Sequence, residues 1–130
     1  MFGIARQMLS FGFIGVIGFL VDVGVLYLAL FCGLGLYAGR AISYLAAVTA
    51  TWGLNRRYTF ERPSGYKKIH EWARFGVSQL SGATINLGIY ALLVHTSPLV
   101  AHNPIIAVAV GSVCGLLVNF SAARAYVFDQ

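Results

Sequence analysis

Two segments of the chain end in nearly the same arrangement of cationic and aromatic residues. The segment LNRRYTF (residues 54–60) carries Arg56 and Arg57, and the segment AARAYVF (residues 122–128) carries Arg124. An arginine guanidinium donates paired hydrogen bonds to phosphate, so these three side chains are candidate ligands for an anionic lipid headgroup. The alternative is an orienting role, in which arginine and aromatic side chains anchor helix ends at a membrane surface.

Asp22 lies deep within an apolar stretch, where an acidic side chain is costly and is expected to face other helices or water. One interpretation is a proton site or a polar lining. The other is a structural partner for Arg40, which lies near the start of the next apolar stretch. Asn86 has the corresponding position in a later stretch, where it could extend the polar lining or form a hydrogen bond between helices.

Asn55 and Asn119 lie near the ends of the two stretches that close on arginine. Their amides would suit a polar vestibule for a headgroup, and they would equally suit hydrogen bonding at helix ends. Four glycines have the spacing of close helix contacts, namely Gly18, Gly82, Gly111 and Gly115. The first two precede Asp22 and Asn86 by four residues, which would place these polar side chains on packed helix faces.

Residues for covalent chemistry are not arranged in any recognisable pattern. Cys32 and Cys114 lack metal-binding spacing, and the three histidines are scattered along the chain. The sequence contains no paired acids, no Ser-His-Asp arrangement, no phosphate-binding GxxxxGK loop and no nucleotide fingerprint. We therefore expect no enzyme activity, no cofactor and no metal site.

The composition predicts a single membrane domain over residues 1–130. Hydrophobic residues make up 58% of the chain and charged residues 10%, whereas soluble domains carry about a quarter charged residues. Four stretches can cross a bilayer, and they run at about 8–31, 37–55, 75–97 and 104–123. Helices are expected, because unpaired backbone is too costly in lipid and the alternation of barrel strands is absent.

The basic residues predict the orientation. Six of the nine lysines and arginines lie in the connection at 56–74, while the other two connections carry almost none. A basic cluster can indicate nucleic-acid binding, but the membrane-like flanks favour a cytoplasmic loop that obeys the positive-inside rule. With four spans, both termini would then be cytoplasmic, in a multi-pass protein of the inner (cytoplasmic) membrane.

The two halves of the chain resemble each other. Residues 11–24 align with residues 75–88, 64 positions later, and both contain the pattern G-x-x-x-[DN]-x-G. The ends of the second and fourth stretches align 68 positions apart, and the change of four residues is about one helical turn. The sequence therefore predicts an all-α fold of two parallel-repeated helical hairpins, related by an axis along the membrane normal.

Together the G-x-x-x-[DN] pattern, the LNRRYTF ending and the R-x-Y-V-F ending at 124–128 resemble the GtrA-like family. The resemblance covers essentially the whole chain. These are small four-span membrane proteins associated with cell-surface polysaccharide synthesis. The family's fourth span usually ends with Asn before Arg, where this chain has Ala123.

The resemblance implies movement of a polyprenyl-phosphate-linked monosaccharide from the cytoplasmic to the outer leaflet. It implies a glycosyltransferase partner and suits a groove or a homo-oligomer, because so small a bundle cannot enclose a wide channel. The phosphate would bind Arg56, Arg57 and Arg124. The sugar would pass a set of polar side chains, namely Asp22, Arg40, Asn55, Asn86 and Asn119.

Two other functions are open. A non-transporting subunit of a glycosyltransferase complex would need the basic loop and the interfacial arginines but not Asp22. A small proton-coupled drug exporter would need an acid deep in the membrane, and Asp22 meets that requirement.

Overall fold

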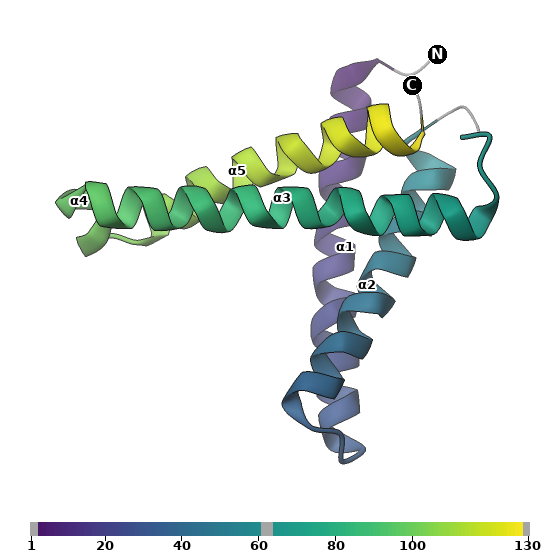
Figure 1. The fold of residues 1–130 in the computed structure, drawn as a ribbon, viewed down its shortest axis with the longest axis horizontal. Helices are drawn as coiled ribbons and strands as arrows, with labels where there is room; N and C mark the ends of the chain where they lie inside the picture. The colour runs from purple at the N-terminus through teal and green to yellow at the C-terminus, as the bar shows by residue number, and fades with distance from the viewer. Residues whose placement is uncertain (1–2, 61–63, 129–130) are drawn as a thin grey trace. The chain divides into compact units, whose positions relative to one another are not determined.

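Helices form almost the whole of the computed structural model, which describes residues 3–60 and 64–128. Within these residues the long helices are α1 (Ile4–Phe31), α2 (Leu36–Tyr58), α3 (Lys68–Thr96) and α5 (Ile105–Ala122). A short helix, α4 (Pro98–His102), precedes α5, and a π-helical turn, η1 (Ala123–Val127), continues it (Figure 1). No strand occurs in the described ranges, so the prediction of an all-helical protein is confirmed.

Three helical segments of the described chain are long and apolar enough to cross a membrane, namely Ile4–Phe31, Lys68–Thr96 and Ile105–Val127. With 28 residues, α1 is about 42 Å long, which exceeds the roughly 30 Å of a hydrocarbon core. Although α2 has a sufficient 23 residues, polar side chains such as Arg40, Thr51 and Asn55 lower its hydropathy. The structure therefore has three candidate spans and a fourth helix, where the sequence predicted four spans.

The connection predicted at 56–74 is shorter in the structure. Since α2 continues to Tyr58 and α3 begins at Lys68, both ends of the predicted loop are helical, including Arg57 and Arg74. The prediction ended the helices where the apolar stretches end. Arginine and lysine are themselves good helix formers, so the helices extend past those limits.

The described residues divide into two compact units between Trp72 and Ala73. Unit one contains α1, α2 and the first turn of α3, and unit two contains the rest of α3 with α4, α5 and η1. Within unit one, α1 and α2 run side by side as a hairpin (Figure 1).

Gly33 forms the turn of this hairpin. Its φ of +92° lies in the left-handed region, which a glycine adopts without steric cost. The N–H of Gly33 donates to the carbonyl of Leu30, and the N–H of Leu34 donates to the carbonyl of Ala29, both at 3.0 Å. This pair of bonds is a Schellman motif, which closes the last turn of α1 and allows α2 to begin at Leu36.

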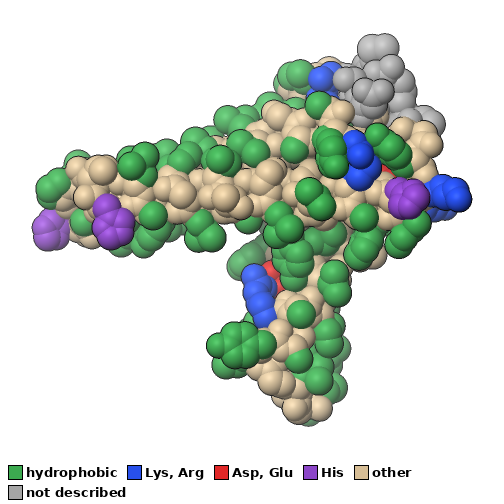
Figure 2. Space-filling model, in the orientation of Figure 1, with side chains coloured by type: hydrophobic (Ala, Val, Ile, Leu, Met, Phe, Trp, Pro, Cys, Tyr) green, Lys and Arg blue, Asp and Glu red, His purple; other side chains and the backbone are tan. Residues whose placement is uncertain are grey.

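Large apolar side chains lie mostly on the surface of the helices. On α1 the exposed ones include Leu9, Phe13, Phe19, Leu20 and Phe31. Figure 2 shows hydrophobic side chains spread over the visible face of the helices, with few charged groups among them. Such a surface is expected where the surrounding solvent is lipid rather than water.

Candidate functional site

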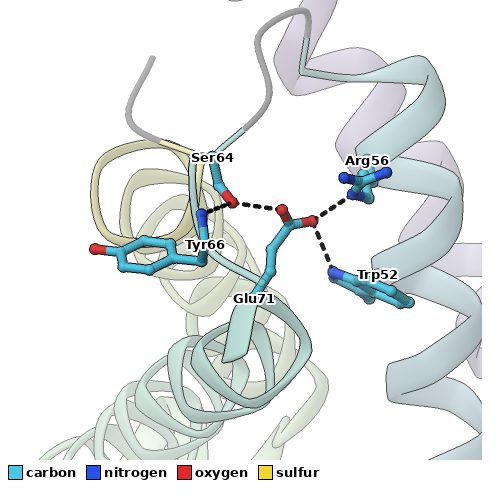
Figure 3. A network of polar contacts seen from close by, with 5 residues as sticks. All are labelled: Trp52, Arg56, Ser64, Tyr66 and Glu71. Atoms are coloured by element: carbon cyan, nitrogen blue, oxygen red, sulfur yellow. Dashed lines mark hydrogen bonds and ion pairs between the residues drawn. The ribbon is translucent and has the colours of Figure 1, made fainter. Parts of the chain in front are cut away.

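A buried carboxylate, Glu71, is the centre of a polar network in unit one (Figure 3). It lies in the first turn of α3, where the helix dipole favours an acidic side chain. Its Oε1 accepts hydrogen bonds from Arg56 Nε at 2.8 Å and Trp52 Nε1 at 2.9 Å. Its Oε2 accepts from Ser64 Oγ at 2.5 Å, and the Tyr66 N–H donates to Ser64 Oγ at 3.2 Å. The network thus joins the end of α2 to the start of α3.

This pairing determines what Arg56 offers to a ligand. The Arg56 side chain is 36% exposed, whereas that of Glu71 is fully buried. The terminal nitrogens of Arg56 form no hydrogen bond with the described residues. Arg56 can therefore present one edge of its guanidinium to an anion, while its charge is already balanced by Glu71.

Arg57 lies in the last turn of α2, and Arg124 lies in η1, which continues α5. Arg57 is exposed, and its guanidinium carbon lies 5.5 Å from the centre of the Tyr58 ring. Arg124 is half-buried. A cation at the carboxyl end of a helix is favoured by the helix dipole. Arg62, which belongs to the predicted basic cluster, lies outside the described residues.

Each unit also contains an arginine that donates a hydrogen bond to the carbonyl of a tyrosine. The tyrosine lies at the end of α2 in unit one and in η1 in unit two. In unit one, Arg6 Nη1 donates to the Tyr58 carbonyl at 3.4 Å. In unit two, Arg74 Nε and Nη2 donate to the Tyr126 carbonyl at 3.1 and 2.7 Å. The Arg74 guanidinium also lies 3.7 Å from the centre of the Tyr126 ring. These carbonyls lie in last helical turns, where carbonyl groups have no intrahelical donor and require another hydrogen-bond partner. The sequence spacing did not predict that Arg6 and Arg74 would be those partners.

Asn55 lies inside unit one rather than on a surface that a headgroup could reach. Its Oδ1 accepts a hydrogen bond from Thr59 Oγ1 at 2.8 Å. Thr59 Oγ1 is in turn 2.7 Å from Ser10 Oγ on α1. In this geometry Asn55 takes part in hydrogen bonding at a helix end.

Asp22 and Arg40 form an ion pair within unit one. The distance from Arg40 Nη1 to Asp22 Oδ1 is 2.5 Å. The Asp22 side chain is 18% exposed and the Arg40 side chain 58%. The hairpin thus brings together two residues that the sequence placed on separate stretches, and each has a structural partner.

Asn86 and Asn119 pack against glycines in unit two. A Cβ atom added to Gly111 would lie 2.6 Å from Asn86 Oδ1, and one added to Gly115 would lie 3.2 Å from Asn86 Cβ. A Cβ atom on Gly82 would overlap the Asn119 amide. The three glycines therefore leave room for the two amide side chains. Asn119 Oδ1 is buried and has no hydrogen-bond partner among the described residues.

An aromatic pair has the same geometry in both units. The ring centres of Phe11 and Phe60 are 6.4 Å apart at an interplanar angle of 66°. The ring centres of Phe75 and Phe128 are 6.4 Å apart at 65°. The first members of the pairs are 64 positions apart and the second members 68, which are the offsets found in the sequence.

A close contact between a glycine and the neighbouring helix also recurs at the offsets of 64 and 68 positions. In unit one a Cβ atom on Gly18 would overlap the Thr51 side chain. The corresponding contact in unit two is that of Gly82 with Asn119. Positions that the sequence aligns are therefore in contact within each unit.

Comparison with protein families gives a match over residues 10–129 to the GtrA/DPMS transmembrane domain. The matched range includes both aromatic pairs, the Glu71 network and the arginines at 56, 57 and 124. A search of curated proteins found no match.

Proposed function

This chain belongs to the GtrA/DPMS transmembrane family, and we propose that it moves a polyprenyl-phosphate-linked monosaccharide across the cytoplasmic membrane. Family membership indicates a membrane protein of polysaccharide or glycolipid synthesis. In this proposal the sugar reaches the outer leaflet while still linked to lipid, and a glycosyltransferase then uses it. No bond is made or broken during the movement, so the chain acts without catalysis and without a cofactor.

The proposal includes a particular topology. All four long helices cross the membrane, the two hairpins are parallel repeats, and both termini are cytoplasmic. The matching geometries of the Phe11–Phe60 and Phe75–Phe128 pairs support the repeat. The basic residues between α2 and α3 support the orientation, because such residues favour the cytoplasmic side.

The observation that carries the proposal is the pair Arg56 and Arg57 at the end of an otherwise apolar hairpin. Arg57 is exposed, and the preceding residue, Arg56, has a partly exposed guanidinium group. Guanidinium groups at a helix end are at the depth of lipid headgroups, where they can bind a phosphodiester. The polyprenyl chain would remain in lipid, against the exposed apolar side chains of the helices.

The test is a transport assay with purified protein in liposomes, which measures exposure of a polyprenyl-phosphate sugar on the far leaflet. Arg57→Ala is expected to slow exposure roughly tenfold, because it removes a charge-assisted contact to phosphate. The comparison variant is Lys68→Ala, which removes an exposed positive charge from the same end of unit one but no guanidinium group. Its effect is expected to be no more than about twofold.

Arg56→Ala is a poorer test, because it leaves the Glu71 carboxylate buried without its ionic partner. Such a loss typically costs about 3–5 kcal/mol of stability, which would confuse binding with folding. If folded wild-type protein exposes no more of the lipid-linked sugar on the far leaflet than empty liposomes do, the proposal that this chain transports it alone is wrong. The non-transporting subunit of a glycosyltransferase complex would then be the better explanation.

A further inference from the structure

Glu71 is an acidic residue among cations. We define the cationic end of unit one by its basic side chains, which are Arg6, Arg56, Arg57, Lys67 and Lys68. The contacts Arg6–Tyr58 and Arg56–Glu71 place the start of α1, the end of α2 and the start of α3 at this end. Of the acidic residues described in unit one, Asp22 is paired with Arg40 along the hairpin, so Glu71 carries the negative charge here. Glu61 and Arg62 lie outside the described residues.

Because the Glu71 side chain is fully buried, its charge can act on an anion that does not touch it. A carboxylate inside the protein is screened by salt much less than one on the surface. It shares its Oε1 with Arg56 Nε at 2.8 Å, so an anion that approaches the outer edge of Arg56 also meets the field of Glu71. With Glu71 ionised, Arg56 and Arg57 together offer one net positive charge rather than two.

We propose that Glu71 is a specificity-determining residue, which offsets the charge of Arg56 and so weakens the preference of this end for a doubly charged phosphate monoester over a singly charged phosphodiester. The inference rests on the proposed function. A sugar-linked polyprenyl phosphate is a diester with one negative charge. The same lipid without its sugar is a monoester that carries nearly two charges above its second pKa of about 6. The charge of Glu71 therefore reduces the electrostatic advantage that the empty lipid would have over the loaded one.

A merely structural role for Glu71 is the competing explanation, because its hydrogen bonds also fix the connection after α2 (Figure 3). Glu71→Gln separates the two explanations. A glutamine Oε1 can accept from both Trp52 and Arg56, and its amide nitrogen can donate to Ser64 Oγ. The variant thus keeps the hydrogen bonds and removes the charge. The position 64 residues earlier is itself a buried glutamine, Gln7.

The experiment measures binding of two probes to the full chain in phosphatidylcholine nanodiscs at pH 8. The probes are farnesyl-phosphoryl-glucose, which is a diester, and farnesyl phosphate, which is a monoester. Wild-type protein is expected to bind both probes. Glu71→Gln is expected to shift the ratio of the two affinities roughly tenfold toward the monoester, as the loss of one unit charge several ångströms away implies.

Two further variants keep the inference falsifiable if Glu71→Gln folds poorly. Ser64→Ala removes a hydrogen bond to Glu71 but keeps its charge, so the wild-type ratio is expected. The double variant Arg56→Gln/Glu71→Gln removes both charges of the pair, so the ratio is expected to return close to that of wild type.

An unchanged ratio in folded Glu71→Gln, or a shift of the same size in Ser64→Ala, would overturn the inference. Wild-type protein that binds neither probe would also overturn it. The proposed function is tested separately by the transport assay in liposomes. Transport together with an unchanged ratio removes only this inference, whereas the expected ratio without transport removes only the proposed movement.

Discussion

Thr59 shows how single polar residues hold this apolar protein together. Its hydroxyl lies between Ser10 of α1 and Asn55 of α2, and Thr59 and Asn55 are both buried. Buried polar groups without partners are costly, and a surrounding bilayer offers no water as a substitute. The hydrogen bonds among the three side chains tie the start of α1 to the end of α2.

We therefore predict that Thr59→Val, which keeps the shape but removes the hydroxyl, lowers the free energy of unfolding by about 1–3 kcal/mol. The measurement is reversible unfolding in mixed micelles. Thr84→Val is the control, because Thr84 is exposed and its hydroxyl donates to the Leu80 carbonyl of its own helix. The control is expected to change stability by no more than about 0.5 kcal/mol. Equal losses in the two variants would show that the contact across the hairpin contributes nothing.

The sequence predicted polar residues in the helices but not their partners. Asp22 and Arg40 stood out because charge is rare in such stretches, and an ion pair between them was one of two interpretations. Whether they meet depends on the length of the turn at Gly33 and on the rotation of the two helices, which spacing alone does not determine. The network of Glu71 with Trp52 was missed because its segment was predicted to be a loop.

At the scale of the elements, α3 and α5 approach each other through glycine. A Cβ atom on Gly115 would lie 2.9 Å from the Gly82 carbonyl oxygen, which is a backbone atom and cannot rotate away. A Cβ atom on Gly111 would lie 2.8 Å from the Asn86 carbonyl oxygen. The spacing Gly111-x-x-x-Gly115 predicted a close contact, but the asparagines that fill it depend on which faces meet.

Gly115→Ala is therefore expected to destabilise unit two by about 1–3 kcal/mol, since the helices must separate to admit a methyl group. The measurement is again the free energy of unfolding in mixed micelles. Gly88→Ala on α3 is the matched control, because a Cβ atom there would meet nothing within 4 Å. That control is expected to be neutral or to stabilise by up to about 1 kcal/mol, as alanine favours helix. Stabilisation by Gly115→Ala would mean that α3 and α5 do not pack closely at this position.

For the whole molecule, the role of α2 is the central question, because it is the long helix outside the three candidate spans. Three of its polar residues have contacts inside unit one. Arg40 binds Asp22, Thr51 packs at Gly18, and Asn55 bonds to Thr59. A helix whose polar groups are satisfied by its partner can cross lipid in spite of a modest hydropathy. Composition alone could not reveal this, because it does not say which side chains are paired.

We predict that α2 crosses the membrane, so that the turn at Cys32 and the connection at Lys67 lie on opposite sides. Cys32 is exposed, so in a Cys114→Ala background a membrane-impermeant maleimide should label it in intact cells. The comparison is a variant with Cys32→Ser, Cys114→Ala and Lys67→Cys, which should be labelled only after permeabilisation, as the basic connection is expected to be cytoplasmic. Lys67 is itself exposed, so poor access within the fold would not explain protection. Labelling of both positions in intact cells would mean that α2 does not cross, and the proposed pair of parallel hairpins would be wrong. The reverse pattern would keep four spans but place both termini outside the cytoplasm, away from the leaflet where the proposed substrate is loaded.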